Sequence, residues 1–325
     1  MRKKVVALFA FIIISLLPAG ILALTGHGAA SGVWGLAGIS GLIASVTFTW
    51  RWIVIAAGGM AVASFAAVAS SHNPWLAGLV MFAVALATSL TARKGLSNSL
   101  SMIPISIGFF LAQPPELADP ADGLTSALLT GLVALVAFMW CGGLVHIATH
   151  HLSLKAKPEV SLTRSVSFAL IVALEVGIEA WCVSKFGLNH AGAWLMLTTV
   201  VILQPTLSES WKKGIHRAIG TVIGVAAALV VSYVIPWTSV LVLIGIACIF
   251  LAVMFRTAWN GPYWRYVAAL TPAIVLLEGV GTSVAGTALD RLVATLIGAT
   301  AAMLTIAALY PLVRRSQAKH PPAAA

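Results

Sequence analysis

Charged side chains are scarce in this sequence, and their scarcity excludes a soluble globular protein. Only 9% of the 325 residues are charged and 60% are hydrophobic, so too few polar groups remain to cover a soluble globule of this length. Unbroken apolar runs of about 20 residues recur along the chain, the length of a helix that crosses a bilayer, whereas a membrane barrel has short alternating segments. The composition therefore predicts an all-α polytopic membrane protein.

Catalytic and cofactor-binding motifs are also missing. The sequence contains no Gly-x-Ser-x-Gly, no phosphate-binding loop and no dinucleotide fingerprint. Its three cysteines lie inside apolar runs without metal-ligand spacing: Cys141, Cys182 and Cys248. His146, His150 and His151 end an apolar run, where interfacial histidines are more common than metal ligands. We expect no enzyme, no cofactor and no bound metal.

Basic residues outnumber acidic ones, which gives a net charge of +10. They form short clusters beside apolar runs, as membrane topology requires, so we expect no nucleic-acid partner. If twelve apolar blocks each cross once from a cytoplasmic amino terminus, every Lys and Arg except Lys185 and Arg291 falls on the cytoplasmic side. This charge bias predicts about twelve membrane helices with both termini in the cytoplasm. The first block is expected to be a retained helix, because it is longer than the core of a signal peptide.

The predicted blocks fall into two sets of six. They are Val5–Leu24, Val33–Phe48, Ile53–Ser70, Trp75–Thr91, Leu96–Ala112, Gly123–Ile147, Ser165–Phe186, Ala191–Leu203, Ile215–Ile235, Val240–Phe255, Trp264–Leu277 and Arg291–Leu312. Gly58 and Gly224 each follow an arginine at the same spacing, and Pro104 and Pro272 occupy matching blocks. These matches predict two parallel six-helix repeats, residues 1–160 and 161–325, with chance likeness between apolar helices as the alternative. Short or proline-interrupted blocks at matching places also point to a transport site.

The most polar stretch between two long blocks runs from Gln204 to Gly224. Gln204-Pro205 ends one apolar run, because proline cannot continue the helical hydrogen bonding. A basic turn with His216 and Arg217 follows, and it would attract an organic anion. Gln204, Pro205, His216 and Arg217 are therefore candidate substrate contacts, and cytoplasmic topology alone is the other explanation of the basic residues.

Small residues follow that turn on one stripe of the next helix. Gly220 and Gly224 are one helical turn apart, a spacing that lets two helix backbones approach closely in lipid. Gly298, in the last block, is a third candidate for close helix packing.

Gln-Pro followed at this distance by Arg-x-x-Gly-Thr-x-x-Gly resembles the signature of the fusaric acid resistance family, which overlaps the aromatic acid exporters. The resemblance is best from Ala191 to Tyr310. It implies a multi-pass transporter of the bacterial inner membrane that exports aromatic or other hydrophobic organic acids on the proton gradient. A passive organic-anion channel is the alternative, because a plant malate-channel family is thought to be related, and a scaffold without transport is a third reading. The implied partners are a small organic anion, protons and lipid, with a homo-oligomer as one form of assembly.

Acidic residues inside apolar blocks are costly and mark proton or ion paths. Glu175 and Glu179 are one helical turn apart on the same face, so one of the two carboxylates could carry a proton. The other explanation for Glu179 is a surface pair with Lys185. Glu278, at the outer end of the eleventh block, is the third proton-coupling candidate.

Arg291 is the basic residue that breaks the charge bias without a basic counterpart in the first half, and it is a candidate anion contact. If the last helix begins at Arg291, the preceding Asp290 caps its amino terminus. Asp122 would cap the helix that begins at Gly123 in the same way.

Overall fold

The computed structural model describes residues 14–15, 17–119, 122–149, 160–257, 259, 261–279 and 283–319. Within this part of the chain every regular element is a helix, which confirms the all-α prediction. The helices form two compact units, one up to Val200 and one from Val201.

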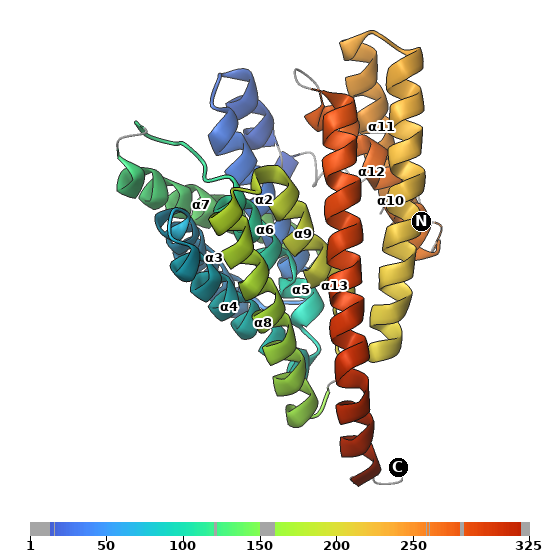
Figure 1. The fold of residues 1–325 in the computed structure, drawn as a ribbon. Helices are drawn as coiled ribbons and strands as arrows, with labels where there is room; N and C mark the ends of the chain where they lie inside the picture. The colour runs from blue at the N-terminus through green and yellow to red at the C-terminus, as the bar shows by residue number, and fades with distance from the viewer. Residues whose placement is uncertain are drawn as a thin grey trace. The chain divides into compact units, whose positions relative to one another are not determined.

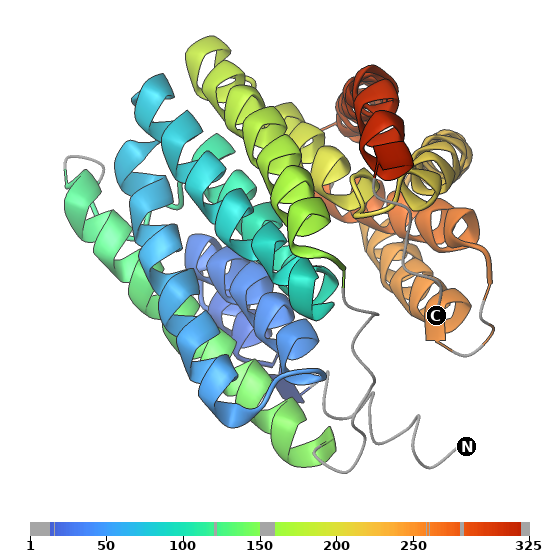
Figure 2. The same cartoon turned by 90° about the horizontal axis from the view of Figure 1, so that it is seen from below.

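The first unit is a layered helical bundle. Its helices are α2 (Gly28–Ser45), α3 (Trp50–Ser70), α4 (Pro74–Leu90), the 3₁₀ helix η1 (Thr91–Lys94), α5 (Ser97–Leu100), α6 (Met102–Ala112), α7 (Gly123–Thr149), α8 (Leu162–Phe186) and most of α9 (Asn189–Ile202). α2 and α3 pack on α7, and α4 packs along α8 (Figures 1 and 2). The short helix α6 contacts α2, α3 and α4 and is buried over nearly its whole length. It forms the centre of this unit.

Short polar sequences set the helix ends in this unit. Asn73 Oδ1 accepts hydrogen bonds from the backbone N–H groups of Trp75 and Leu76 at 3.1 and 3.2 Å, directly before the proline that opens α4. Asp122 accepts the N–H of Thr125 at 3.0 Å at the start of α7, which confirms the predicted cap. The hydrogen bonds from Thr125 lower the pKa of the exposed Asp122 carboxyl.

The second unit contains four long or medium helices. They are α10 (Leu207–Val234), α11 (Thr238–Thr257), α12 (Tyr263–Glu278) and α13 (Val284–Lys319). α12 contacts the other three, and α13 also packs on α10 (Figure 1). Its apolar core consists of Val225, Ala228, Leu241, Val275, Leu276 and Ala288. Because α13 begins at Val284, Asp290 lies inside the helix, and the prediction that it caps the last helix is wrong.

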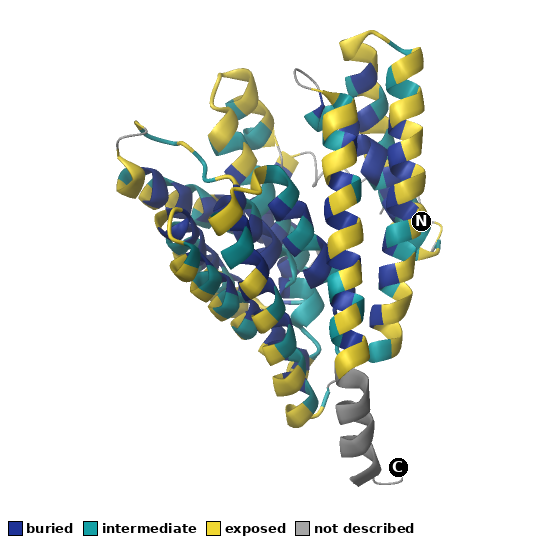
Figure 3. Ribbon diagram, in the orientation of Figure 1, coloured by how far each residue is buried: buried dark blue, intermediate teal, exposed yellow. Residues whose placement is uncertain are grey.

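Eight helices of the described chain are long and apolar enough to cross a membrane. They are Gly28–Ser45, Trp50–Ser70, Pro74–Lys94, Gly123–Ile147, Leu162–Phe186, Leu207–Val234, Thr238–Arg256 and Val284–Ala308. Many of their large apolar residues are exposed, and Figure 3 shows the exposed residues as yellow stretches of the helices. Such faces suit contact with lipid rather than water.

Three predicted blocks are shorter in the structure than a membrane crossing. α6, α9 and α12 have 11, 14 and 16 residues, so even α12 is only about 24 Å long against a hydrocarbon core of about 30 Å. The prediction of twelve full crossings is therefore too high for the described residues. The block Val5–Leu24 lies partly outside them, and the location of the termini remains a prediction.

The two units do not follow the boundary expected from the repeats. α8 and most of α9 belong to the first unit, which ends at Val200. Within the units, α3 packs on α7 and α10 packs on α13, pairs that occupy corresponding places in the two sets of six. The two-repeat arrangement remains a prediction that this correspondence favours.

Candidate functional site

Two buried arginines lie near each other in the second unit. Arg217, on α10, is 5% exposed, and Arg291, on α13, is 3% exposed. The Nη1 atom of Arg217 donates a hydrogen bond to the hydroxyl of Tyr263 at 3.4 Å. The charge of Arg291 interacts electrostatically with Arg217, and also with Tyr263 and Tyr266. The rings of Tyr263 and Tyr266 stack with their centroids 5.8 Å apart. We call these four residues the arginine–tyrosine cluster.

The cluster depends on where α10 begins. The prediction of a basic turn before this helix is wrong, because α10 begins at Leu207 and the basic residues lie on its first helical turns. Glu209 stands in the first turn, where an acidic side chain stabilises the helix dipole. Arg217 therefore lies about 15 Å along the helix, at a rise of about 1.5 Å per residue. His216 is half-buried beside it.

Two glycines bring α10 close to α12. A Cβ placed on Gly220 would lie 2.6 Å from the carbonyl oxygen of Trp264, and one on Gly224 would lie 2.6 Å from Cβ of Thr271. Real side chains do not approach so closely, so both positions need glycine unless the helices separate. This contact holds Tyr263 and Tyr266, at the start of α12, beside Arg217. Gly298 is buried on α13.

Gln204 and Pro205 form the connection between α9 and α10. The side-chain amide of Gln204 donates to the carbonyl oxygens of Val201 and Leu203 at 3.2 and 2.7 Å, and its backbone N–H donates to Ser210 Oγ at 2.8 Å. These bonds satisfy carbonyls at the end of α9. Gln204 is 9% exposed, so its side chain stabilises the connection. A role in substrate binding remains a prediction.

The acidic pair lies in the first unit. Glu179 is only 7% exposed on α8, and Thr199 Oγ1 of α9 donates a hydrogen bond to its Oε1 at 2.6 Å. The alternative of a surface pair with Lys185 is therefore wrong. Glu175, one turn earlier, is half-buried, with both carboxylate oxygens shielded from solvent. Its charge interacts with that of Glu179.

Glu278 is the last residue of α12 and is half-buried. Its charge interacts with that of Arg291, so it belongs to the surroundings of the arginine–tyrosine cluster rather than to those of the acidic pair. The two arginines and Glu278 together carry a formal charge of +1. Such a site suits a single carboxylate.

Tyr263, Tyr266 and Thr199 were not predicted as site residues. The two tyrosines stand in the run Pro-Tyr-Trp-Arg-Tyr at the start of a short block, and this dense aromatic and basic run is a signal that sequence reasoning could have used. Thr199 gives no such signal, because nothing in the spacing along α9 shows that it faces α8.

Comparison with known proteins identifies the segment that holds these sites. Residues 176–305 match the profile of a protein family described as fusaric acid resistance protein-like. The expected family resemblance is confirmed. The matched segment includes Glu179, the motif from Gln204 to Gly224, the arginine–tyrosine cluster and Glu278, and it begins one residue after Glu175.

Three bacterial proteins resemble the chain over about half its length. An uncharacterized protein, ORF2, of Neisseria gonorrhoeae is 28% identical over 156 residues, which are 48% of this chain and 37% of the relative. The inner membrane protein YccS of Escherichia coli is 29% identical over 159 residues, 47% of this chain and 20% of YccS. An uncharacterized protein of Haemophilus influenzae is 24% identical over 145 residues, 44% of this chain and 20% of the relative. No solved structure matches.

The matched regions therefore span about a third or less of these relatives. Together, the segment that matches the fusaric acid resistance protein-like profile, the inner-membrane relative and the eight candidate membrane helices indicate a multi-pass protein of the bacterial inner membrane.

Proposed function

We propose that this protein exports aromatic or other hydrophobic carboxylic acids across the inner membrane, driven by the proton gradient. The observation that carries the proposal is the arginine–tyrosine cluster of the second unit. It combines two cationic side chains with two stacked phenol rings inside a membrane-embedded bundle.

The chemistry of the cluster matches an aromatic acid at both ends. A guanidinium can hold a carboxylate through two parallel hydrogen bonds, and a tyrosine ring can stack on the ring of the substrate. Burying a charged side chain costs free energy unless the charge is paired or hydrogen-bonded. Two buried arginines near each other lower the stability of the fold, because their like charges repel. A bound anion would offset this repulsion, so the pair favours a role in anion binding.

Proton coupling is assigned to the acidic pair of the first unit. Glu179 is buried and accepts the Thr199 hydroxyl, and its neighbour Glu175 lies on the same face of α8. Ionising both carboxylates at once is unfavourable, so the pair is suited to taking up and releasing one proton. A passive anion channel would use the same arginines but would need no titrating carboxylate.

Efflux from vesicles tests the anion site. Proteoliposomes loaded with radiolabelled 4-hydroxybenzoate should lose it under an imposed pH gradient faster than protein-free vesicles do. Arg217→Gln and Arg291→Gln should each slow this efflux at least tenfold, a loss of roughly 1.4 kcal/mol of stabilisation. The matched control is Arg265→Gln, which removes an exposed arginine of α12 and should leave efflux within about twofold of the wild type.

Two outcomes would count against the proposal. Equal efflux in wild type, Arg217→Gln and Arg291→Gln would contradict the anion site. Efflux that depends on both arginines but proceeds equally with and without a pH gradient would favour the channel. Each variant is compared only after its elution profile in detergent matches that of the wild type.

A further inference from the structure

A cavity of about 470 Å³ lies in the first unit between α3, α4, η1, α5 and α6. Apolar side chains form most of its wall, among them Ile55 and Ala63 of α3, Val84 of α4 and Ile103 of α6. Its volume falls within the roughly 300–1,000 Å³ of small-molecule sites. The proposed transport chemistry does not use it.

The cavity is an open groove along α3. Its lining residues on this helix run from Trp52 to Ala63, a distance of about 16 Å at 1.5 Å per residue. Half of a hydrocarbon core about 30 Å thick is of the same size. Ile55 and Gly59 are exposed along this wall, and a Cβ on Gly59 would meet no atom within 4 Å. The groove therefore has the length of one leaflet and is open at the helix surface.

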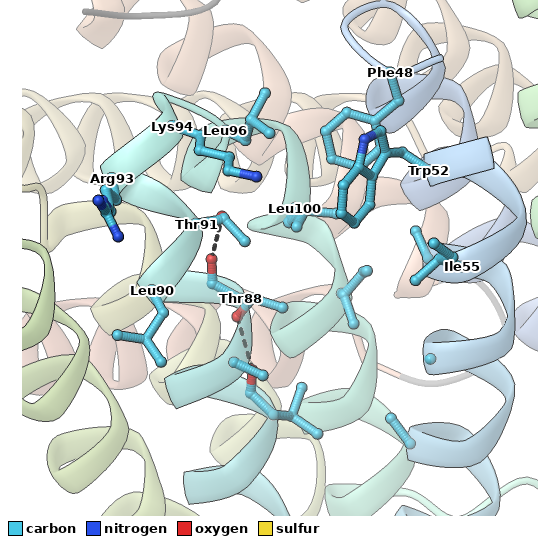
Figure 4. A pocket seen from close by; sticks show the side chains of 16 residues that line it. Phe48, Trp52, Ile55, Thr88, Leu90, Thr91, Arg93, Lys94, Leu96 and Leu100 are labelled. Carbon is cyan, nitrogen blue, oxygen red and sulfur yellow. Dashed lines mark hydrogen bonds between the residues drawn. The ribbon is translucent and has the colours of Figure 1, made fainter. Parts of the chain in front are cut away.

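One end of the groove is cationic. The ammonium of Lys94 lies 5.3 Å from the ring centroid of Trp52. Figure 4 shows Lys94 pointing across the mouth toward Trp52, whereas Arg93 points to the other side of η1. Tryptophan and lysine at a helix end are the residues that anchor a protein at the level of lipid headgroups.

The polar groups in the wall are already used within the protein. Thr88 Oγ1 donates to the carbonyl oxygen of Val84 at 2.8 Å, and Thr91 Oγ1 donates to that of Thr88 (Figure 4). The interior therefore presents hydrocarbon, and charge is presented only at the mouth. An aromatic acid is too short to fill a groove of this length. An anionic phospholipid has a long apolar chain and a negative charge at one end, which match the apolar wall and the cationic mouth of the groove.

We propose that the groove binds an anionic phospholipid, with one acyl chain along α3 and the phosphate at Lys94. The site is independent of the arginine–tyrosine cluster and of the acidic pair. The lipid would fill the space between α3 and α4 and tie η1 to the headgroup layer.

Native mass spectrometry of the full chain in detergent tests the proposal. Phosphatidylglycerol or phosphatidylcholine is added, and the fraction of lipid-bound protein is measured. Gly59→Leu places a side chain in the open space of the groove and should weaken phosphatidylglycerol binding at least tenfold. Gly58→Leu is the matched control, because Gly58 also has no atom within 4 Å of a Cβ but does not line the groove. It should bind as the wild type does.

A second pair of variants tests the mouth. Lys94→Gln should reduce the preference for phosphatidylglycerol over phosphatidylcholine at least threefold, whereas Arg51→Gln, an exposed arginine outside the groove, should keep it. Phosphatidylglycerol binding that is unchanged in both Gly59→Leu and Lys94→Gln would overturn the proposal. Loss of 4-hydroxybenzoate binding in Gly59→Leu with unchanged lipid binding would assign the groove to a transported acid and overturn the lipid assignment. If Gly59→Leu does not fold, Lys94→Gln decides alone.

Discussion

Glu179 illustrates what a single residue contributes in this fold. A carboxylate at this depth is costly unless it is protonated or hydrogen-bonded, and the Thr199 hydroxyl supplies one bond. The sequence predicted the pair with Glu175, because residues four apart share a helix face. It could not predict Thr199 or Tyr263, since contacts between helices depend on rotation about each axis. Residue positions within a helix were therefore predictable, and partners on other helices were not.

We expect Glu175→Gln and Glu179→Gln each to abolish efflux driven by a pH gradient, while 4-hydroxybenzoate binding stays within about threefold of the wild type. Glutamine keeps the shape and polarity of the side chain but cannot take up a proton at neutral pH. Vesicle efflux with and without the gradient measures the effect. Glu116→Gln, at an exposed loop position before α7, is the matched control. Normal gradient-driven efflux by both variants would contradict the proton-coupling role and show that the two glutamates have a structural role.

At the scale of helices, the sequence predicted the long apolar elements better than their ends. The ninth block was expected to begin at Ile215, but α10 begins at Leu207. A search for apolar runs does not detect helical turns that project polar side chains, although Glu, Lys and Trp in this stretch are compatible with a helix. The short helices α6, α9 and α12 fall where short or proline-containing blocks were expected.

The two glycines that occupy matching positions in the predicted repeats should differ in tolerance. Gly224→Leu would force a side chain into Thr271 and Pro272, so we expect it to destabilise the protein by about 1–3 kcal/mol or more. Gly58→Leu meets open space and should be nearly neutral. Thermal unfolding followed by size exclusion in detergent compares the two. Equal melting temperatures would mean that α10 and α12 separate readily.

At the scale of the whole molecule, composition was enough to predict an all-α membrane protein, and the motif was enough to predict the family whose profile residues 176–305 match. The number of complete crossings was not predictable, because hydropathy alone does not show that α9 and α12 stop short. The assignment of α8 to the first unit was not predictable either. It depends on the packing of α8 against α4, where Gly78 and Gly177 meet.

The charge bias places Arg51 in the cytoplasm and Lys185 on the opposite side. With the native cysteines replaced by serine, single cysteines at these positions should react with a membrane-impermeant maleimide from opposite sides of oriented vesicles. Reporter fusions at both termini should give cytoplasmic signals. Labelling of both positions from one side, or a periplasmic terminus, would contradict the predicted topology.

The contact at Gly220 and Gly224 also limits how the second unit can change shape. The backbone of α10 there meets the carbonyl oxygens of Trp264 and Ala268 and the branched or cyclic side chains of Val267, Thr271 and Pro272. Such side chains have little rotamer freedom, so we expect α10 and α12 to move as one body. Between α10 and α13 the neighbour of Gly214 is instead the flexible end of Met303. A shear within this unit would therefore occur along α13. Because Arg291 is on α13 and Arg217 is on α10, such sliding would change the distance between the two guanidinium groups. The affinity for an anion bound between them would change with that distance.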